Sequence, residues 1–308
     1  MTIAIIGAGM AGLACAEALT ARGHTVRLFD KGRGPGGRMS TRRVSTPFGD
    51  ASFDHGAQYF TARDPGFAKI VAGWEAGGVA TKWPQVSPDA WIGTPGMNAP
   101  VKHMAAHHDV TWGCRVDALK RTETGWVLFA DGEPIGDYDA AILAIPAEQV
   151  GAIIRSHAPE MAIVADATIA LPCWTIMLAF ENPIDTPTET IRDAGPIGWA
   201  ARNSAKPGRT GPEAWVIQAS PEWSTAHLED EADSVTIALT QDWAETLGIA
   251  APTPLSATAH RWRYARSGKA GKDALWDANL KLGVCGDWLL APRIECAWLS
   301  GTALGNCV

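Results

Sequence analysis

The chain has 308 residues, a formal net charge of -7 at pH 7 and a pI near 5.6. That length can bury a large core and suffices for two domains, so one larger and one smaller unit are expected. The acidic balance, with basic residues gathered in short loops, disfavours nucleic acid and anionic membranes as partners.

Cysteine spacing and hydropathy further limit the class of protein to which the chain can belong. None of the six cysteines lies in a C-x-x-C pair, so neither a disulfide framework nor a metal site is predicted. The apolar start lacks a basic leader and is broken by three glycines, which argues against a signal peptide, and no other apolar run has membrane-spanning length. We therefore expect a soluble protein of the cytoplasm.

The first 22 residues have the pattern of a dinucleotide-binding unit. Residues 2–6 are an apolar run of strand length, residues 13–22 favour a helix, and the turn between them is Gly-Ala-Gly-Met-Ala-Gly. Its first glycine permits a tight turn, its second lets the backbone approach a pyrophosphate, and its third lets the helix pack closely on the sheet. The helix amino terminus would face the phosphate charge.

A second predicted strand, residues 25–29, is followed by an acidic residue, which would lie at the same edge of the sheet. Asp30 follows Gly12 by 18 positions, close to the spacing at which an acid binds a ribose hydroxyl. A carboxylate accepts hydrogen bonds from a free 2'-hydroxyl but repels a 2'-phosphate. NADP is therefore disfavoured at this first site.

A second glycine-rich loop, R-G-P-G-G-R at residues 33–38, indicates which dinucleotide is bound, FAD or NAD. Arg38 could place its guanidinium against the pyrophosphate as a forked donor, which simple nicotinamide dehydrogenases do not need. A solvated basic loop is the alternative, since Arg33, Arg42 and Arg43 stand close by. The placement of the glycines favours a flavin dinucleotide.

The remaining elements of the first half follow from periodicity and turn signals. The apolar run at residues 140–145, ended by Pro146, is typical of a buried parallel strand. Helices are expected at residues 66–76, 99–107 and 147–155, and strands at residues 110–112 and 126–130, with a turn at Asp131 and Gly132.

The second half combines strands with one long helix. Strands are expected at residues 170–180, 214–219 and 282–285, and helices at residues 231–247 and 294–304. Residues 198–209 are interpreted as a loop, in which three cations, an amide and a tryptophan could bind a carboxamide and phosphates. The alternative is a solvated turn with its tryptophan in the core.

Five segments of the chain resemble the flavin-dependent amine oxidase superfamily and, within it, the bacterial renalases. They are GAGMAG, GGRMSTRR, DHGAQYF, ARNSAKPGR and CGDWLLAPRIECAWLSG. The resemblance implies an α/β fold with a Rossmann-like FAD-binding domain and a second, α+β substrate domain, in a p-hydroxybenzoate hydroxylase or amine oxidase-like topology. The expected FAD-binding domain comprises residues 1–64, 96–165 and 256–308, and the substrate domain residues 65–95 and 166–255.

The resemblance also implies how these segments meet FAD. Gly56 to Tyr59 would pass along the flavin ring, Val116 would present backbone to the adenine, and Asp287 would hold the ribityl chain or pyrophosphate. Cys296 stands where relatives often carry glycine, which puts close approach to the ring in doubt there. The expected FAD contacts are Gly7, Gly9, Met10, Ala11, Gly12, Asp30, Lys31, Gly36, Gly37, Arg38, Met39, Gly56, Ala57, Gln58, Tyr59, Val116, Gly286, Asp287, Glu295 and Ala297.

The activity implied by the resemblance is oxidation of the 2- or 6-dihydro isomers of NAD(P)H. A hydride would pass to FAD, giving NAD(P)+, and O2 would reoxidise the flavin with release of hydrogen peroxide. Tyr59 and Trp288 would wall the substrate, and Arg202 and Asn203 would contact its carboxamide. The alternatives are an amine oxidase, whose relatives place a lysine near the flavin that could not be assigned here, and a flavin-binding module without turnover.

Overall fold

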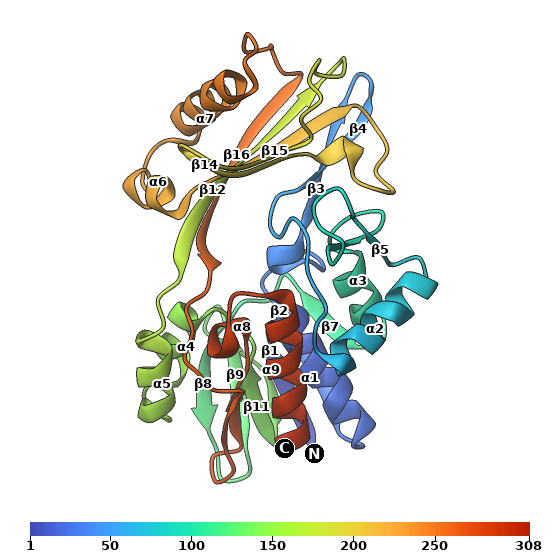
Figure 1. Cartoon of the computed structure of the whole chain (residues 1–308). Coiled ribbons are helices and arrows are strands. Elements are labelled where there is room, and N and C mark those ends of the chain that lie inside the picture. The colour runs from blue at the N-terminus through green and yellow to red at the C-terminus, as the bar shows by residue number, and fades with distance from the viewer.

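The computed structural model describes residues 1–308, and two sheets of different kinds organise them (Figure 1). The first is six-stranded, with the order β17-β18-β11-β1-β2-β7. All of its pairings are parallel except that of β17 with β18. Its strands are β1 (Thr2–Ile6), β2 (Thr25–Asp30), β7 (Asp109–Trp112), β11 (Ala140–Leu143), β17 (Leu275–Asp277) and β18 (Leu282–Val284).

The six-stranded sheet is buried on both faces, as its continuous apolar strands predict. Along β1, Ile3 and Ile5 belong to the core on one face, whereas Ala4 and Ile6 belong to the core on the other. Helices α1 (Met10–Ala21), α3 (Ala99–Ala105) and α9 (Ile294–Cys307) contribute to the first core. The second core is completed by helices α4 (Ala147–Ile154) and α5 (Pro159–Asp166) and by a small sheet of β8 (Val116–Arg121), β9 (Trp126–Ala130) and β10 (Glu133–Tyr138).

Helices α1 and α9 cross in very close contact, although they come from opposite ends of the chain (Figure 1). A Cβ atom at Gly301 would overlap the backbone oxygen of Ala11, so only glycine fits at this crossing. None of the helices combines the length and apolar character that crossing a membrane would require.

The second sheet is antiparallel, with the order β13-β14-β15-β12-β16. One of its faces packs on α7 (Ala232–Leu247) through Val235, Leu239 and Trp243, the recurrence that predicted this helix. The strands are β12 (Leu171–Phe180), β13 (Thr190–Ala194), β14 (Ile197–Arg202), β15 (Glu213–Ala219) and β16 (Ser256–Arg266), and the short helix α6 (Pro221–Ala226) packs beside β12.

The prediction of a loop over residues 198–209 was wrong in its first half. Residues 197–202 form strand β14, which pairs with β13 and β15, and only then does the 3-10 turn Asn203–Ala205 begin. The segment Gly198-Trp199-Ala200-Ala201 has little strand propensity of its own. Pairing on both edges supplies the hydrogen bonds that hold it extended.

A β-hairpin links the two sheets (Figure 1). Strands β3 (Thr41–Thr46) and β4 (Gly49–Asp54) extend from the second glycine loop to the five-stranded sheet, where Phe53 packs against Met177 and Val216. Helix α2 (Pro65–Ala76) and the hairpin of β5 (Ala80–Lys82) and β6 (Trp91–Gly93) join the core around α1. The expected domain division stays a prediction, but its boundary at residue 256 falls inside the five-stranded sheet, because β16 pairs with β12.

Candidate active site

The glycine turn after β1 is built as the sequence predicts. Gly7 has a φ of +103°, which favours glycine, and a Cβ atom at Gly12 would overlap the Gly7 oxygen. Around Gly9, by contrast, there is open space. No side chain caps the start of α1 and no acid lies in its first turn, so its N–H groups are free for an anion.

Asp30 lies at the mouth of this turn. Its carboxylate accepts the backbone N–H of Ala8 at 2.8 Å and that of Gly32 at 2.7 Å, which fixes it beside the start of α1. Lys31 donates to Gln149 across the edge of the sheet at 3.2 Å. The open glycine turn, the uncapped helix and the fixed acid fit the diphosphate and ribose of a dinucleotide.

Arg38 and Asp287, both expected to contact FAD, form an ion pair with each other. Two guanidinium nitrogens of Arg38 donate to the two oxygens of Asp287 at 2.8 and 2.6 Å, and Ser267 donates to the same carboxylate at 2.7 Å. The forked pairing leaves other guanidinium N–H groups for a ligand. It also ties the second glycine loop to the start of α8 (Asp287–Leu290).

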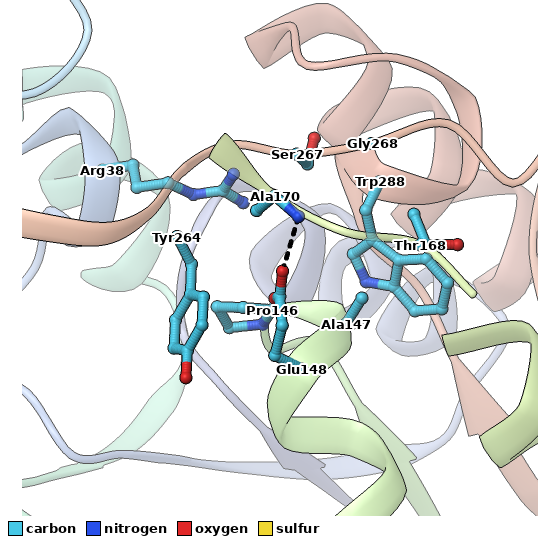
Figure 2. A pocket seen from close by; sticks show the side chains of 10 residues that line it. All are labelled: Arg38, Pro146, Ala147, Glu148, Thr168, Ala170, Tyr264, Ser267, Gly268 and Trp288. Atoms are coloured by element: carbon cyan, nitrogen blue, oxygen red, sulfur yellow. Dashed lines mark hydrogen bonds between the residues drawn. The ribbon is translucent and has the colours of Figure 1, made fainter. Parts of the chain in front are cut away.

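Arg38 and Trp288 line a crevice, with Tyr264 on the same side as Arg38 (Figure 2). Trp288 is buried and donates its ring N–H to the oxygen of Ile145 at 3.2 Å, which fixes the indole plane. Between Tyr264 and Trp288, Glu148 accepts the N–H of Ala170 at 2.7 Å (Figure 2). Trp288 therefore lines this crevice, and its expected role as a wall of the substrate site stays a prediction.

The segment from Gly56 to Tyr59 packs directly against the second glycine loop. The N–H of Ala57 donates to the oxygen of Arg38 at 2.8 Å, and a Cβ atom at Gly56 would overlap that oxygen. In the loop, Gly36 and Gly37 have φ angles of +154° and +52°, and Met39 is buried behind them. Two segments proposed separately as flavin contacts are therefore neighbours in space.

The start of α9 is also held in place. Glu295 accepts the backbone N–H groups of Arg63 and Asp64 at 2.5 and 2.6 Å and pairs with Arg293. Cys296 is buried, and burial raises the pKa of its thiol. Its side chain leaves the first turn of α9 helical, with Ala297 bonded back to Arg293. The remaining expected contacts, Gly286 and Val116, are buried at the ends of β18 and β8.

The face of the five-stranded sheet turned away from α7 carries a row of polar and aromatic residues, which we call the polar row. Trp199 is paired with Gln218, Gln218 with Thr175, and Thr175 with His260, so the four lie side by side across four strands. Gln218 donates to the oxygen of Gly56 at 2.7 Å. The polar row thus lies opposite the segment expected along the flavin ring.

Aromatic rings surround Trp199, at one end of the polar row. The rings of Tyr59 and Trp199 are 5.7 Å apart, Trp83 lies 6.4 Å from Trp199, and the Arg192 guanidinium lies 4.6 Å from its centre. The indole N–H of Trp199 is buried without a partner.

Two histidines and a tryptophan occupy the other end of the row. The ring of His55 is 5.1 Å from His260 and stacks on Trp262 at 5.3 Å, and Trp262 donates to the His55 oxygen at 2.8 Å. Burial, together with the charges of His260 and Arg42, lowers the pKa of His55 to about 4. Burial and Arg42 also lower the pKa of His260. Both imidazoles are therefore neutral at pH 7.

A buried ion cluster lies beneath the polar row. The Asp54 carboxylate lies 3.2 Å from the Lys206 ammonium and 2.6 Å from the Arg209 guanidinium, and it also accepts from Thr41 and Met97. Burial opposes ionisation of Asp54, but the two cations and these hydrogen bonds hold its pKa far below the usual range. Burial lowers the pKa of Lys206 to about 8, although Asp54 favours the charged form.

Lys206 also contacts the segment expected along the flavin ring. Its ammonium group donates to the side-chain oxygen of Gln58 at 3.1 Å and to the Gln58 backbone oxygen at 3.3 Å. Gln58 also donates to the oxygen of Asp54 at 2.5 Å, so its side chain is turned toward the ion cluster. No local pattern indicates this contact, because 148 positions separate the two residues.

Arg202 and Asn203, expected to contact a carboxamide, are not brought to the polar row. Arg202 is paired in register with Trp215, on the α7 face, where its Nε atom lies 3.2 Å from the Glu213 carboxylate in an ion pair. Asn203 is fully buried, accepts the N–H of Asp54 and donates to the oxygen of Ser52. Strand alternation turns Arg202 away, and the amide of Asn203 is used to anchor β4.

Protonation of His55 should destabilise the fold in acid. Its folded pKa, about 4, lies below its ordinary value of 6.5, so the unfolded chain binds more protons between these values. Stability should fall as the pH drops from 6.5 to 4, by at most about 1.4 kcal/mol per pH unit. Urea unfolding at several pH values should show a weaker dependence for His55→Phe, but an unchanged one for His103→Phe, which alters an exposed histidine. Equal slopes in all three proteins would contradict this prediction.

Two family models match the chain. The one described as flavin containing amine oxidoreductase covers residues 85–276, more than half of the chain, and the one described as NAD(P)-binding Rossmann-like domain covers residues 5–73. The chain therefore belongs to the flavin-containing amine oxidoreductase family. It is an FAD-dependent oxidoreductase, and FAD is its cofactor.

Solved structures of similar fold cover almost the whole chain. A protein described as a protoporphyrinogen oxidase from Exiguobacterium sp. 255-15 has a TM-score of 0.76 at 13% identity, covering 99% of this chain and 98% of that one. A doubly substituted putrescine oxidase has a TM-score of 0.73 at 13% identity, covering 100% and 99%. Cyclohexylamine oxidase from Brevibacterium oxydans IH-35A has a TM-score of 0.73 at 11% identity, covering 99% and 98%.

One curated relative matches a short segment only. The 4,4'-diapophytoene desaturase (4,4'-diaponeurosporene-forming) of Staphylococcus haemolyticus (strain JCSC1435) is 55% identical over 40 residues. The match spans 13% of this chain and 8% of that protein.

Proposed function

We propose that this oxidoreductase is renalase-like and oxidises dihydronicotinamide dinucleotides reduced at the 2- or 6-position of the ring. FAD, when bound, would supply the redox chemistry by which the dihydronicotinamide loses a hydride to become NAD(P)+ and O2, with one proton from solvent, becomes hydrogen peroxide. The chain's own residues have to bind, orient and desolvate the substrate.

The observation that carries this proposal is the positive charge around the polar row. Lys206 and Arg209 share a single buried carboxylate, Asp54, and Arg42 adds a further charge that is felt at both His55 and His260. Amines are cations at neutral pH and would be repelled, whereas a dinucleotide carries negative charge and would be attracted. The local charge therefore favours a dinucleotide over an amine.

The aromatic end of the polar row suits a flat ring with a carboxamide. Tyr59 and Trp199 offer ring faces, and Gln218 offers a side-chain oxygen that remains free while its nitrogen bonds Gly56. A dihydronicotinamide becomes aromatic when it loses a hydride, so no strong base is needed. Orientation by these groups should supply most of the rate.

An amine oxidase is the second candidate function. Two of the similar structures are by name a putrescine oxidase and a cyclohexylamine oxidase, and Lys206 is a buried lysine beside Gln58. The ammonium group of Lys206, however, donates to Asp54 once and to Gln58 twice. These contacts favour a role in positioning Gln58 over a direct role in amine oxidation.

Anaerobic flavin reduction separates these functions. The oxidised yellow protein would be mixed separately with the 2- and 6-dihydro isomers, with ordinary NADH and NADPH, and with primary and secondary amines. Flavin reduction would be followed as the loss of the flavin absorbance band at about 450 nm. The expected result is rapid bleaching by the dihydro isomers and slow or no bleaching by the others. Bleaching by an amine alone would replace this proposal with the amine oxidase, and bleaching by no compound would indicate a flavin module without turnover.

A further inference from the structure

Residues 84–89, which we call the 84–89 segment, connect strands β5 and β6 at the surface. None of these six residues is buried, whereas Trp83 and Ala90 on either side of them are. The N–H of Trp83 donates to the oxygen of Ala90 at 2.9 Å, which closes the hairpin at the start of the segment. The 84–89 segment therefore projects from a fixed base and can move without opening the hairpin.

The base of this hairpin is bonded to the segment expected along the flavin ring. Phe60, which follows Tyr59, exchanges two backbone hydrogen bonds with Trp91 of β6, each 2.8 Å long. The hairpin is therefore fixed beside Tyr59, and the 84–89 segment extends from there.

A single side chain, that of Arg192 on β13, bonds the 84–89 segment to the five-stranded sheet. Arg192 donates to the backbone oxygen of Val86 at 3.2 Å, and no other hydrogen bond joins the segment to this sheet. Arg192 is also paired in register with Trp199, and its guanidinium lies 4.6 Å from the centre of the Trp199 ring. The same side chain thus holds the segment and covers the ring at the end of the polar row.

The aromatic end of the polar row is closed in this arrangement. The rings of Tyr59 and Trp199 are 5.7 Å apart, whereas a flat ring stacked between two others needs on the order of 7 Å, or two contacts of about 3.5 Å. Arg192 fills the space over the Trp199 ring, but Arg192 itself is exposed to solvent. A ligand ring therefore reaches the face of Trp199 by displacing Arg192.

We propose that the 84–89 segment is a gate over the aromatic end of the polar row and that Arg192 holds it closed. This inference rests on the proposed function, which places the nicotinamide ring against Tyr59 and Trp199. When Arg192 releases Val86, the segment and the guanidinium move away from Trp199, while the base of the hairpin stays bonded to Phe60. One exposed hydrogen bond contributes little to stability, so the gate can open without unfolding its surroundings.

The first test measures the position of the gate without any substrate. Spin labels would be attached to Gln85→Cys and Ala257→Cys, two exposed positions on the segment and on β16, with the exposed Cys307 replaced by Ser. In the FAD-loaded protein, Arg192→Gln should add a population with a longer distance between the labels. Arg155→Gln, which removes an exposed arginine outside this sheet, should not. Identical distance distributions in the wild type and Arg192→Gln would overturn the gate.

The second test separates entry of the substrate from the chemical step. In anaerobic mixing with a dihydronicotinamide dinucleotide, Arg192→Gln should raise the rate of flavin reduction at low substrate concentration about 3- to 10-fold, as loss of one hydrogen bond allows. The limiting rate at high concentration should stay the same. Arg192→Lys keeps a donor for Val86 and should lie closer to the wild type.

The failures of the gate and of the proposed function can be told apart. An unchanged or lower rate of Arg192→Gln at low substrate concentration would overturn the gate, since a lower rate would make Arg192 a substrate contact instead. If no dihydronicotinamide bleached the flavin, the proposed function would fail, and the distances between the spin labels would still decide whether Arg192 holds the 84–89 segment closed.

Discussion

Asp54→Asn should lower the free energy of unfolding by about 3–5 kcal/mol, the range for breaking a buried ion pair by removing one partner. The carboxylate is completely buried and is the shared partner of Lys206 and Arg209. Without it, two buried cations would face each other with no counterion, and Lys206 could relieve the repulsion only by losing its proton. The loss should therefore be larger at pH 6 than at pH 9, since the pKa of Lys206 is about 8 even beside Asp54.

Urea unfolding of the FAD-loaded protein at both pH values measures this effect. Asp50→Asn is the matched control, because Asp50 is an exposed acid of the same hairpin that accepts a bond from Ser45. The control should change stability by less than about 0.5 kcal/mol. A loss below about 1 kcal/mol for Asp54→Asn would show that the cluster does not depend on this carboxylate.

Gly12→Ala should yield protein that lacks flavin and is less stable by about 1–3 kcal/mol or more, as overpacked sites are. The added methyl group would overlap the backbone oxygen of Gly7. To relieve the overlap, either the tight turn or the start of α1 would have to shift, and the contact between them would be lost. The start of α1 would then no longer face the diphosphate. The ratio of flavin to protein absorbance, together with thermal unfolding of the apoprotein, measures both consequences.

Substitutions of two further glycines serve as comparisons for Gly12→Ala. Gly9 has open space around it, so Gly9→Ala should leave the apoprotein stable but weaken FAD binding, because the methyl group would stand where the pyrophosphate approaches. Gly73, within α2, also has open space and lies away from the turn, so Gly73→Ala should leave flavin content unchanged and raise stability by about 0.5–1 kcal/mol, because alanine favours a helix interior. Normal flavin content in Gly12→Ala would contradict the role given to this turn.

The parts of the fold that local chemistry specifies could be predicted from the sequence. The strand, glycine turn, helix and acid of residues 2–30 were predicted and confirmed, because each depends on residues within a few positions of one another. Helices α2, α7 and α9 were predicted, α7 from its apolar recurrence and α9 with the family resemblance, and all three are present within a few residues of their expected bounds. FAD followed from the pairing of two glycine loops with a distant Gly-Asp, and the family match supports it.

The substrate side of the site could not be predicted in the same way. The polar row exists only because Trp199, Gln218, Thr175 and His260 share one register across four strands, and register is set by long-range pairing. The cations of residues 202–209 were singled out by composition, but alternation along β14 turns Arg202 to the α7 face. Lys206 turns instead to Asp54, 152 positions earlier in the chain.

The close crossing of α1 and α9 has a consequence for folding during synthesis. The nascent chain exposes the glycine turn within its first residues, but the helix that packs on α1 and the strand that pairs with β11 emerge only with residues 282–307. Until then one flank of the six-stranded sheet and the Gly301 contact surface on α1 stay uncovered. We therefore expect stable FAD capture to require residues 282–307, and the apolar strands of a shorter nascent chain to be prone to aggregation.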